Sequence, residues 1–326
     1  MRRTARTLIT VALAAFAVAG TAGWASGGAQ EAVTGAPVGT GAWVGAGLPD
    51  PEGMGPAGTA RFFAGLDPVR RKRLVREHPA VVGNLDGAPL ELRYEANALT
   101  TEGRFGEARV LAHDPRGRGQ VALVYGDLAR AAHVAVIVPG SDVDAGHVRP
   151  LADMAAALRR ATGDRTAVVA WAGYTTPVGV GLDAATGRLA EAGAERLARF
   201  ADGLAAVGAA EPSVFCHSYG SVVCGLAAHE LKAKDLVVFG SPGMRAENVA
   251  ELGTSARVWA AKDPTDWIDC VPNVSFAGLG HGADPTGPSF GARRIPAEDA
   301  AGHGGYFAAG TSSLRAFAAI AEGDVR

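Results

Sequence analysis

The sequence predicts an α/β fold in which a mostly parallel central sheet is covered by helices on both faces. Two observations carry this prediction. Short and almost continuously apolar segments, such as 133–140 (HVAVIVPG) and 213–218 (SVFCHS), are typical of strands that are buried on both faces. They alternate with segments of helical periodicity, above all 150–161 and 184–207, as parallel strands joined by crossover helices do.

The other elements fit the same scheme in chain order. A segment with helical spacing of apolar residues begins near Ala60. Residues 108–115 and 120–127 are predicted strands joined by the short turn DPRGRGQ, so this end of the sheet is expected to be antiparallel. Further strands are expected at 166–173, 235–243 and 256–263, and further helices at 218–233 and 312–321.

Composition and motifs exclude several classes of protein. The chain has 326 residues, of which 48% are hydrophobic and 20% charged, as in a globular protein. The formal net charge is -2, so the chain as a whole does not attract nucleic acid, and we expect no nucleic-acid partner. No phosphate-binding loop, dinucleotide fingerprint or zinc-protease motif is present, and we expect no cofactor and no metal. Asp142 and Asp144 lack a third ligand at supporting spacing and are expected to be turn and surface residues.

The N-terminus has the pattern of a secretory signal peptide. Arginines precede an apolar run at 8–20, and small residues around Ala25 suit cleavage after that residue, which predicts a signal peptide over 1–25. A retained anchor is the alternative, but the run is shorter than the ~20 residues that span a membrane. Arg2 and Arg3 leave the export route open. We expect a secreted or extracytoplasmic protein, with cell-envelope association open and no stable membrane span after cleavage.

The rest of the chain divides into two parts by composition. Residues 26–59 are rich in Gly and Pro, carry almost no charge and show no periodicity, so they are predicted to be a linker. Residues 60–326 are predicted to form a single domain that begins with a helical segment.

Ser218 stands between a predicted strand and a predicted helix, in the stretch CHSYGSVVC. Gly220 and Cys216, two places to either side, are small enough for the sharp turn of a nucleophile elbow, although Cys216 replaces the glycine of the G-x-S-x-G form. The Tyr219 N–H would then start a helix and bind an oxyanion, together with the Ser141 N–H from the loop after HVAVIVPG. The alternative is that the serine only caps the helix.

A nucleophilic serine needs a base, and the base needs an orienting carboxylate. In the α/β-hydrolase arrangement these follow the serine in the order Asp or Glu, then His. His303, in a glycine-flanked loop before the last predicted helix, is the predicted base, and His281 is its competitor. Asp266, in the loop after the last long strand, is the predicted acid, and Asp263 is second.

Three cysteines remain in the exported chain, which permits one disulfide and one free thiol. Cys216 and Cys224 bracket the predicted turn and could form a short-loop pair. The alternative, that both are small buried thiols, stays open.

A set of motifs is spread over the chain from roughly Arg61 to the C-terminus: HPAVVGNLDGAP, RYEAN, CHSYGSVVCGLAA, FGSPGM, DWIDCVPN, GLGHGADP with FGARR, and GHGGYF. Together these motifs resemble a bacterial α/β-hydrolase family that is catalogued as a domain of unknown function and is frequent in high-GC Gram-positive bacteria. The resemblance implies the α/β-hydrolase fold and a serine triad, matched here by Ser218, Asp266 and His303, and it implies no substrate.

These observations predict a secreted serine hydrolase that acts on an acyl bond, most simply an ester, through an acyl-enzyme intermediate. The expected partner is a small-molecule or lipid-like acyl substrate, and the oligomeric state is left open. Two alternatives remain: a peptidase or amidase with the same triad, and a non-catalytic surface binding module built on the same fold.

Overall fold

An eight-stranded sheet forms the centre of the computed structural model, which describes residues 29–276 and 279–325. The predicted signal peptide over 1–25 lies outside the described residues. The strand order is β1-β2-β4-β3-β5-β6-β7-β10. Neighbouring strands from β4 to β10 are parallel, whereas β1 with β2 and β2 with β4 pair antiparallel. The mostly parallel sheet with an antiparallel end, predicted from the sequence, is thereby confirmed.

Seven strands match the apolar segments, and three short strands are not predicted by the pattern. The sheet consists of β1 Arg109–Asp114, β2 Gln120–Tyr125, β3 His133–Val138, β4 Thr166–Ala172, β5 Pro212–His217, β6 Asp235–Phe239, β7 Arg257–Ala261 and β10 Arg293–Ile295, and β8 Ser275–Phe276 pairs separately with β9 Leu279–Gly280.

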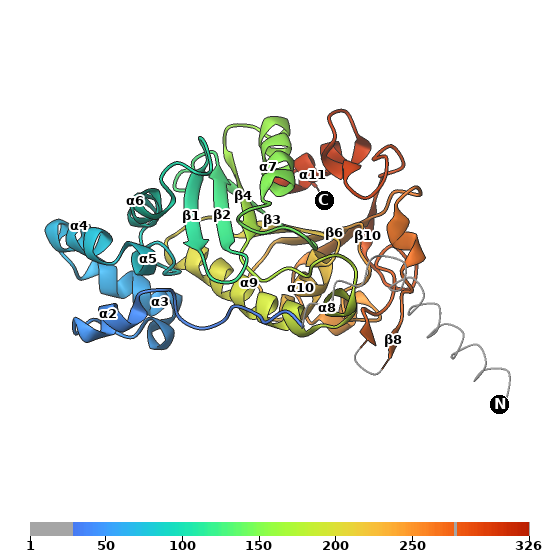
Figure 1. The fold of residues 1–326 in the computed structure, drawn as a ribbon. Helices are drawn as coiled ribbons and strands as arrows, with labels where there is room; N and C mark the ends of the chain where they lie inside the picture. Colours follow the sequence, from blue (N-terminus) through green and yellow to red (C-terminus); the bar gives the residue numbers. More distant parts are fainter. Residues whose placement is uncertain (1–28, 277–278, 326) are drawn as a thin grey trace.

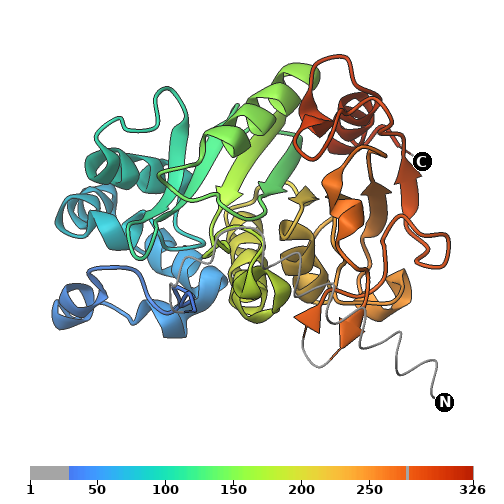
Figure 2. The ribbon, with the colours of Figure 1, turned by 45° about the vertical axis from the view of Figure 1, so that its right-hand side comes forward.

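Helices cover both faces of the sheet (Figures 1 and 2). Helices α7 and α11 lie on one face and α9 and α10 on the other, and each face has its own cluster of buried apolar side chains. The helices are α2 Thr40–Gly45, α3 Pro51–Ala64, α4 Pro68–Glu77, α5 Pro79–Val82, α6 Leu90–Thr101, α7 Arg149–Ala161, α8 Leu182–Ala185, α9 Arg188–Ala206, α10 Gly220–Ala227 and α11 Ser312–Ala321, with 3-10 turns η1 Val249–Leu252, η2 Trp267–Cys270 and η3 Gly305–Phe307.

The prediction of a linker over 26–59 is wrong for its described part. Helices α2 and α3 occupy much of it, and Trp43 is fully buried in a third apolar cluster formed by the N-terminal helices. The Gly- and Pro-rich composition conceals a regular helix start, in which Asp50 caps α3 and Pro51 takes the first helical position. Arg199 of α9 also donates a hydrogen bond to the Pro51 carbonyl, which joins this layer to the main fold.

Two predicted helix boundaries also change. The predicted helix over 184–207 starts inside the short α8, and α9 begins only at Arg188. The predicted helix over 218–233 is reduced to α10, because Ser218 and Tyr219 belong to the turn before it. No helix within 29–276 or 279–325 is both long and apolar enough to cross a membrane.

Candidate active site

A sharp turn at Ser218 joins β5 to α10 at the carboxyl edge of the sheet. The strand ends at His217 and the helix begins at Gly220. Ser218 has a φ of 53°, in the left-handed region that residues other than glycine rarely adopt. Its N–H donates a hydrogen bond to the Phe239 carbonyl at the end of β6, at 3.0 Å. The surrounding strands therefore hold the serine in a strained backbone conformation.

Two glycines make room for this turn. A Cβ atom at Gly220 would lie 2.6 Å from the Val138 carbonyl oxygen, which no side chain tolerates. A Cβ atom at Gly140, in the loop after β3, would lie 2.6 Å from the Ser218 Cβ. The close approach of these backbones explains why both positions need glycine.

A disulfide explains the cysteine that stands where the G-x-S-x-G form has glycine. Cys216 and Cys224 are bonded to one another, and both are fully buried in the cluster between the sheet and helices α9 and α10. The bond decides the alternative that the sequence left open and ties the last turn of β5 to α10. Cys270 is a free, exposed thiol.

Asp266 and His303 are brought together by the loops after β7 and before α11. Asp266 Oδ1 lies 2.8 Å from His303 Nδ1, and Asp266 Oδ2 accepts a hydrogen bond from the Tyr306 hydroxyl at 2.6 Å. The Ile268 N–H donates to the same carboxylate. Burial alone would raise the pKa of Asp266, but the hydrogen bonds from His303, Tyr306 and Ile268 outweigh it and hold this pKa below its usual range.

Asp263 accepts hydrogen bonds from loop backbone amides and none from the His303 imidazole among the described residues. Its buried carboxylate accepts hydrogen bonds from the Thr265 N–H, the Ala301 N–H and the Gly302 N–H. These contacts fix the turn that immediately precedes His303. Among the described residues, no hydrogen bond between Asp263 and the His303 ring is found.

The His303 imidazole lies beside the end of β6, the strand whose last residue accepts a hydrogen bond from the Ser218 N–H. A Cβ atom at Gly240 would lie 3.1 Å from His303 Nδ1 and 3.0 Å from Asp266 Oδ2. Gly240 directly follows Phe239, the acceptor of the Ser218 N–H. The three predicted triad side chains therefore gather at the ends of β5 and β6. In the described part of the chain, Ser218 Oγ has no hydrogen bond to His303.

Two aromatic neighbours hold the His303 ring in place. His217 Nε2 lies 2.8 Å from the His303 carbonyl oxygen, and the two rings are 4.6 Å apart. Burial lowers the pKa of His217 to about 4, so its ring is neutral and donates from Nε2 to that carbonyl. The Trp267 ring lies 4.5 Å from the imidazole and is 46% exposed. Sequence reasoning gave neither His217 nor Tyr306 a role in the site.

The predicted oxyanion donors lie on either side of the serine. The Tyr219 N–H stands at the N-terminus of α10, and Ser141 follows Gly140, which touches the serine. The Tyr174 hydroxyl fixes that loop by donating to the Pro139 carbonyl at 2.7 Å. Within the described residues, neither the Ser141 nor the Tyr219 amide donates a hydrogen bond to another protein group.

His281, the competitor of His303, has a different environment. Its Nε2 lies 2.7 Å from the Ala184 carbonyl, and its ring packs against that of Tyr219. Burial lowers the pKa of His281 to about 4. The structure places no carboxylate in contact with this ring among the described residues.

Asp142 is exposed in a turn, as expected, whereas the expectation of a surface position is wrong for Asp144, which is buried. Asp142 accepts a hydrogen bond from the Gly179 N–H, and Asp144 pairs with Arg118 at 2.5 Å. Within residues 29–276 and 279–325, no three His, Cys, Asp or Glu side chains are grouped so that they could hold a metal ion.

A mostly parallel sheet with helices on both faces, and a sharp serine-bearing turn between β5 and the helix after it, has the architecture of the α/β-hydrolase fold. The chain belongs to the alpha/beta hydrolase family, whose model matches residues 114–276, half of the chain. The matched range includes Ser218 and Asp266 and ends before His303.

The curated relatives are mycobacterial proteins described as uncharacterized. The chain is 28% identical over 369 residues to the protein Rv2079 of Mycobacterium tuberculosis, an alignment that covers 84% of this chain and 56% of the relative. It is 34% identical over 161 residues to the protein Mb0988c of Mycobacterium bovis, covering 44% and 59%. The chain therefore spans little more than half the length of these relatives.

Several solved structures are similar at low sequence identity. A serine hydrolase without a lid from Xanthomonas campestris has a TM-score of 0.40 at 18% identity, covering 68% of this chain and 94% of that one. An esterase domain from Rhodothermus marinus has a TM-score of 0.35 at 14% identity, covering 63% and 92%.

Proposed function

We propose that the protein is a serine hydrolase that cleaves an acyl bond, most simply an ester, through an acyl-enzyme. Ser218 is the nucleophile, His303 the general base and Asp266 the residue that orients the base. The observation that carries the proposal is the 2.8 Å contact between Asp266 Oδ1 and His303 Nδ1 beside the strained turn at Ser218. Because Nδ1 faces the carboxylate, Nε2 is the nitrogen left to accept the serine proton.

The proposed reaction has two halves. Ser218 Oγ forms a bond to the acyl carbon while its proton passes to His303 Nε2, and Asp266 stabilises the resulting imidazolium. The Ser141 and Tyr219 amides bind the oxyanion of the tetrahedral intermediate. The intermediate then expels the leaving alkoxide, which takes the proton from His303. In the second half a water molecule attacks the acyl-enzyme, gives its proton to His303, and Ser218 Oγ leaves with that proton as the carboxylic acid is released.

The depressed pKa of Asp266 suits this role. An orienting carboxylate must stay ionised while the imidazole beside it is protonated, and the hydrogen bonds from His303, Tyr306 and Ile268 hold the pKa of Asp266 below its usual range despite burial. Asp266 is 2% exposed, so this ion pair would be weakly screened by solvent.

Exposed apolar side chains support a small-molecule or lipid-like acyl substrate. The segment after β4 carries Val178 and, at the start of α8, Leu182, which are 56% and 69% exposed. The loop after β7 carries Trp267 beside the imidazole, and an isolated β-bridge between Thr186 and Leu279 joins the two regions. Since both loops follow carboxyl ends of the parallel strands, they would border an acyl group bound at Ser218.

The disulfide supports export. A bond between Cys216 and Cys224 persists in oxidising compartments and is rare in a reducing cytosol. We therefore propose that the chain acts outside the cytoplasm, in agreement with the signal-peptide pattern over 1–25.

Hydrolysis of matched esters and amides tests the proposal. The purified protein is expected to hydrolyse p-nitrophenyl acyl esters, and Ser218→Ala is expected to lower kcat by about 10⁶-fold, whereas Asp266→Asn lowers it by about 10⁴-fold. Ser255→Ala, at an exposed serine, is the control.

The acyl anilides with the same acyl groups separate the alternatives. Equal efficiency on anilides and esters would identify a peptidase or amidase instead. A folded wild-type protein that turns over neither would contradict the proposal and favour a binding module.

A further inference from the structure

A cavity lies apart from the predicted triad, between the sheet and the N-terminal layer. It is bounded by β1, β2 and β4, by α9 and by the segment 34–37 that precedes α2. Its volume is about 240 Å³, room for about eight water molecules at about 30 Å³ each. Trp171 and Phe200 form an apolar wall with ring centroids 5.9 Å apart, and none of Ser218, Asp266 and His303 lines it.

Most charges around this cavity are already paired. Arg116 donates to both carboxylate oxygens of Asp114. Arg93 donates to Asp86 at 3.1 Å, and Arg199 Nε lies 4.0 Å from the same carboxylate. The Asp86 carboxylate therefore lies within reach of two arginines.

Among the described arginines that line this cavity, Arg196 on α9 is the one that forms no ion pair with a carboxylate. Its Nε donates to the Gly173 carbonyl at 2.5 Å, and no ion pair or further hydrogen bond of its guanidinium is found among the described residues. Glu195 beside it is exposed, and the Glu52 carboxylate accepts the Ala36 N–H. Burial lowers the pKa of Arg196, as expected for a cation that lacks its counterion.

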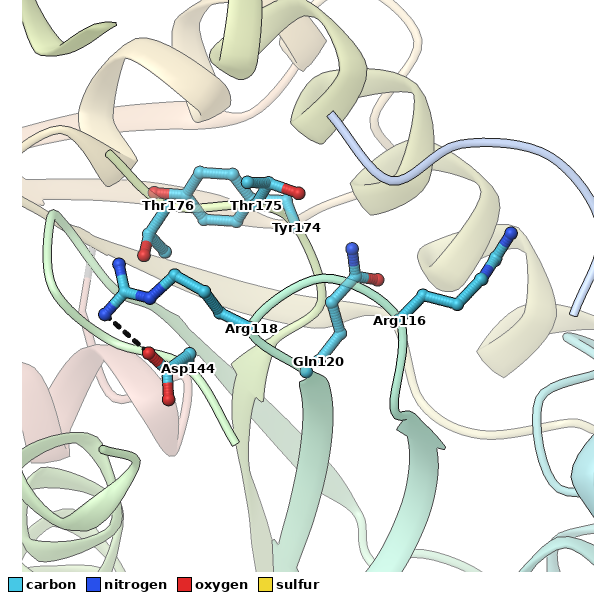
Figure 3. Close-up of a pocket in the computed structure, with 8 residues that line it drawn as sticks. Arg116, Arg118, Gln120, Asp144, Tyr174, Thr175 and Thr176 are labelled. Atoms are coloured by element: carbon cyan, nitrogen blue, oxygen red, sulfur yellow. Dashed lines mark ion pairs between the residues drawn. The ribbon is translucent and has the colours of Figure 1, made fainter. Parts of the chain in front are cut away.

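Gln120 supplies a second, independent sign of a missing partner. Its side chain is 3% exposed, and neither its amide nitrogen nor its amide oxygen has a hydrogen-bond partner. A buried polar group of this kind calls for an explanation. Gln120 lines this cavity and also a small neighbouring pocket, which Figure 3 shows with the Gln120 amide between Arg116 on one side and the Arg118–Asp144 ion pair on the other.

We propose that this cavity binds a small organic anion whose carboxylate or phosphate pairs with Arg196 and accepts a hydrogen bond from the Gln120 amide. The planar guanidinium fork matches the oxygens of either group. The remainder of the ligand lies against Trp171 and Phe200, which favours an aromatic or aliphatic body of modest size. The proposal stands without the proposed hydrolase activity.

The cavity also borders the loop beside the serine. Arg196 is bound to Gly173, and the next residue, Tyr174, donates to the Pro139 carbonyl. Pro139 precedes Gly140, which touches Ser218. An anion at Arg196 would thus contact the segment that supports the predicted oxyanion loop.

Calorimetric titration at constant ionic strength tests the proposal with three probes of similar shape: benzoate, phenyl phosphate and neutral benzamide. We expect saturable binding of at least one anion and at least about tenfold weaker binding of benzamide. Arg196→Gln and Gln120→Leu should each weaken binding of that anion, Arg196→Gln by about tenfold or more. Arg76→Gln, at an exposed arginine of α4, is the matched control.

Binding at the catalytic site is separated by Ser218→Ala and by a fluorophosphonate-blocked sample, both of which should bind the anion as the wild type does. Loss of binding in the blocked sample would assign it to the catalytic site and overturn the proposal. Absence of saturable binding of both anions up to roughly 10 mM would overturn it as well. If Arg196→Gln does not fold, the binding of the anion to Arg196→Lys and to Gln120→Leu is measured instead. An affinity for the anion equal to that of the wild type in both variants contradicts the proposal.

Discussion

Tyr306 connects the two aspartates of the site. Its hydroxyl donates to Asp266 Oδ2 at 2.6 Å and accepts from the Asp263 N–H at 3.0 Å, and the side chain is fully buried. Burial and the neighbouring Asp266 carboxylate raise the pKa of Tyr306 well above its usual range. One hydroxyl thus positions the carboxylate that faces His303 and the backbone of the loop that carries it.

Removal of this hydroxyl should cost stability. Tyr306→Phe removes the hydrogen bond that the Tyr306 hydroxyl donates to the charged Asp266 carboxylate, a kind of contact that contributes about 1.5–3 kcal/mol. Chemical denaturation should show the free energy of unfolding reduced by about 2 kcal/mol. Tyr94→Phe is the matched control, because the Tyr94 hydroxyl is also buried but has no partner. Equal stability of the two variants would contradict this assignment.

The order of Ser, Asp and His along the chain is enough to predict the site residues. It does not show which of the two aspartates contacts the histidine. Asp263 and Asp266 lie three residues apart in one loop, so their spacing from the strand allows either to face a histidine. Their difference arises from residues 301–306, which bind Asp263 through backbone amides and Asp266 through side chains. That difference depends on a contact across about forty residues, which no local pattern contains.

At the scale of elements, the disulfide joins β5 to α10 around the turn at Ser218. Cys216 and Cys224 are eight residues apart, and a loop of this length is expected to contribute about 2.5 kcal/mol through the unfolded chain. We expect a reductant to lower the melting temperature of the wild type. In the Cys216→Ala, Cys224→Ala double variant, which retains the free Cys270, the reductant should leave the melting temperature unchanged. A wild-type melting temperature indifferent to complete reduction would contradict this prediction.

The accuracy of element prediction followed the strength of the apolar pattern. Strands β3 and β5 are continuous apolar runs and were predicted at nearly their observed bounds. Strand β10 has three residues, two of them exposed arginines, and gave no signal. Helix α3 was missed because its glycines and prolines are typical of linkers, whereas packing of the N-terminal layer against α9 overrides that composition.

At the scale of the whole molecule, buried neutral histidines make stability depend on pH. Burial lowers the pKa of both His217 and His281 from the ordinary 6.5 to about 4. Between these values the unfolded chain binds protons that the folded protein does not, so the free energy of unfolding falls as the pH drops from about 6.5 to about 4 and is fully present above 6.5. Each histidine contributes up to about 3 kcal/mol.

Chemical denaturation at several pH values measures how steeply the free energy of unfolding changes with pH. His217→Gln and His281→Gln should each flatten it, whereas His229→Gln, at an exposed histidine, is the control. The aspartates with depressed pKa values, such as Asp266, lose their contribution only below the ordinary aspartate value of 3.8, outside this window. Stability that does not change between pH 6.5 and 4.5 would contradict the neutral state of these rings.

Covalent labelling tests whether Ser218 is a nucleophile activated by His303. The purified protein is treated with a fluorophosphonate and the adduct is located by peptide mass spectrometry. We predict one adduct on Ser218, none in Ser218→Ala, and strongly slowed labelling in His303→Ala but not in His281→Ala. An unlabelled, folded wild type, or labelling that persists in Ser218→Ala, would contradict the account.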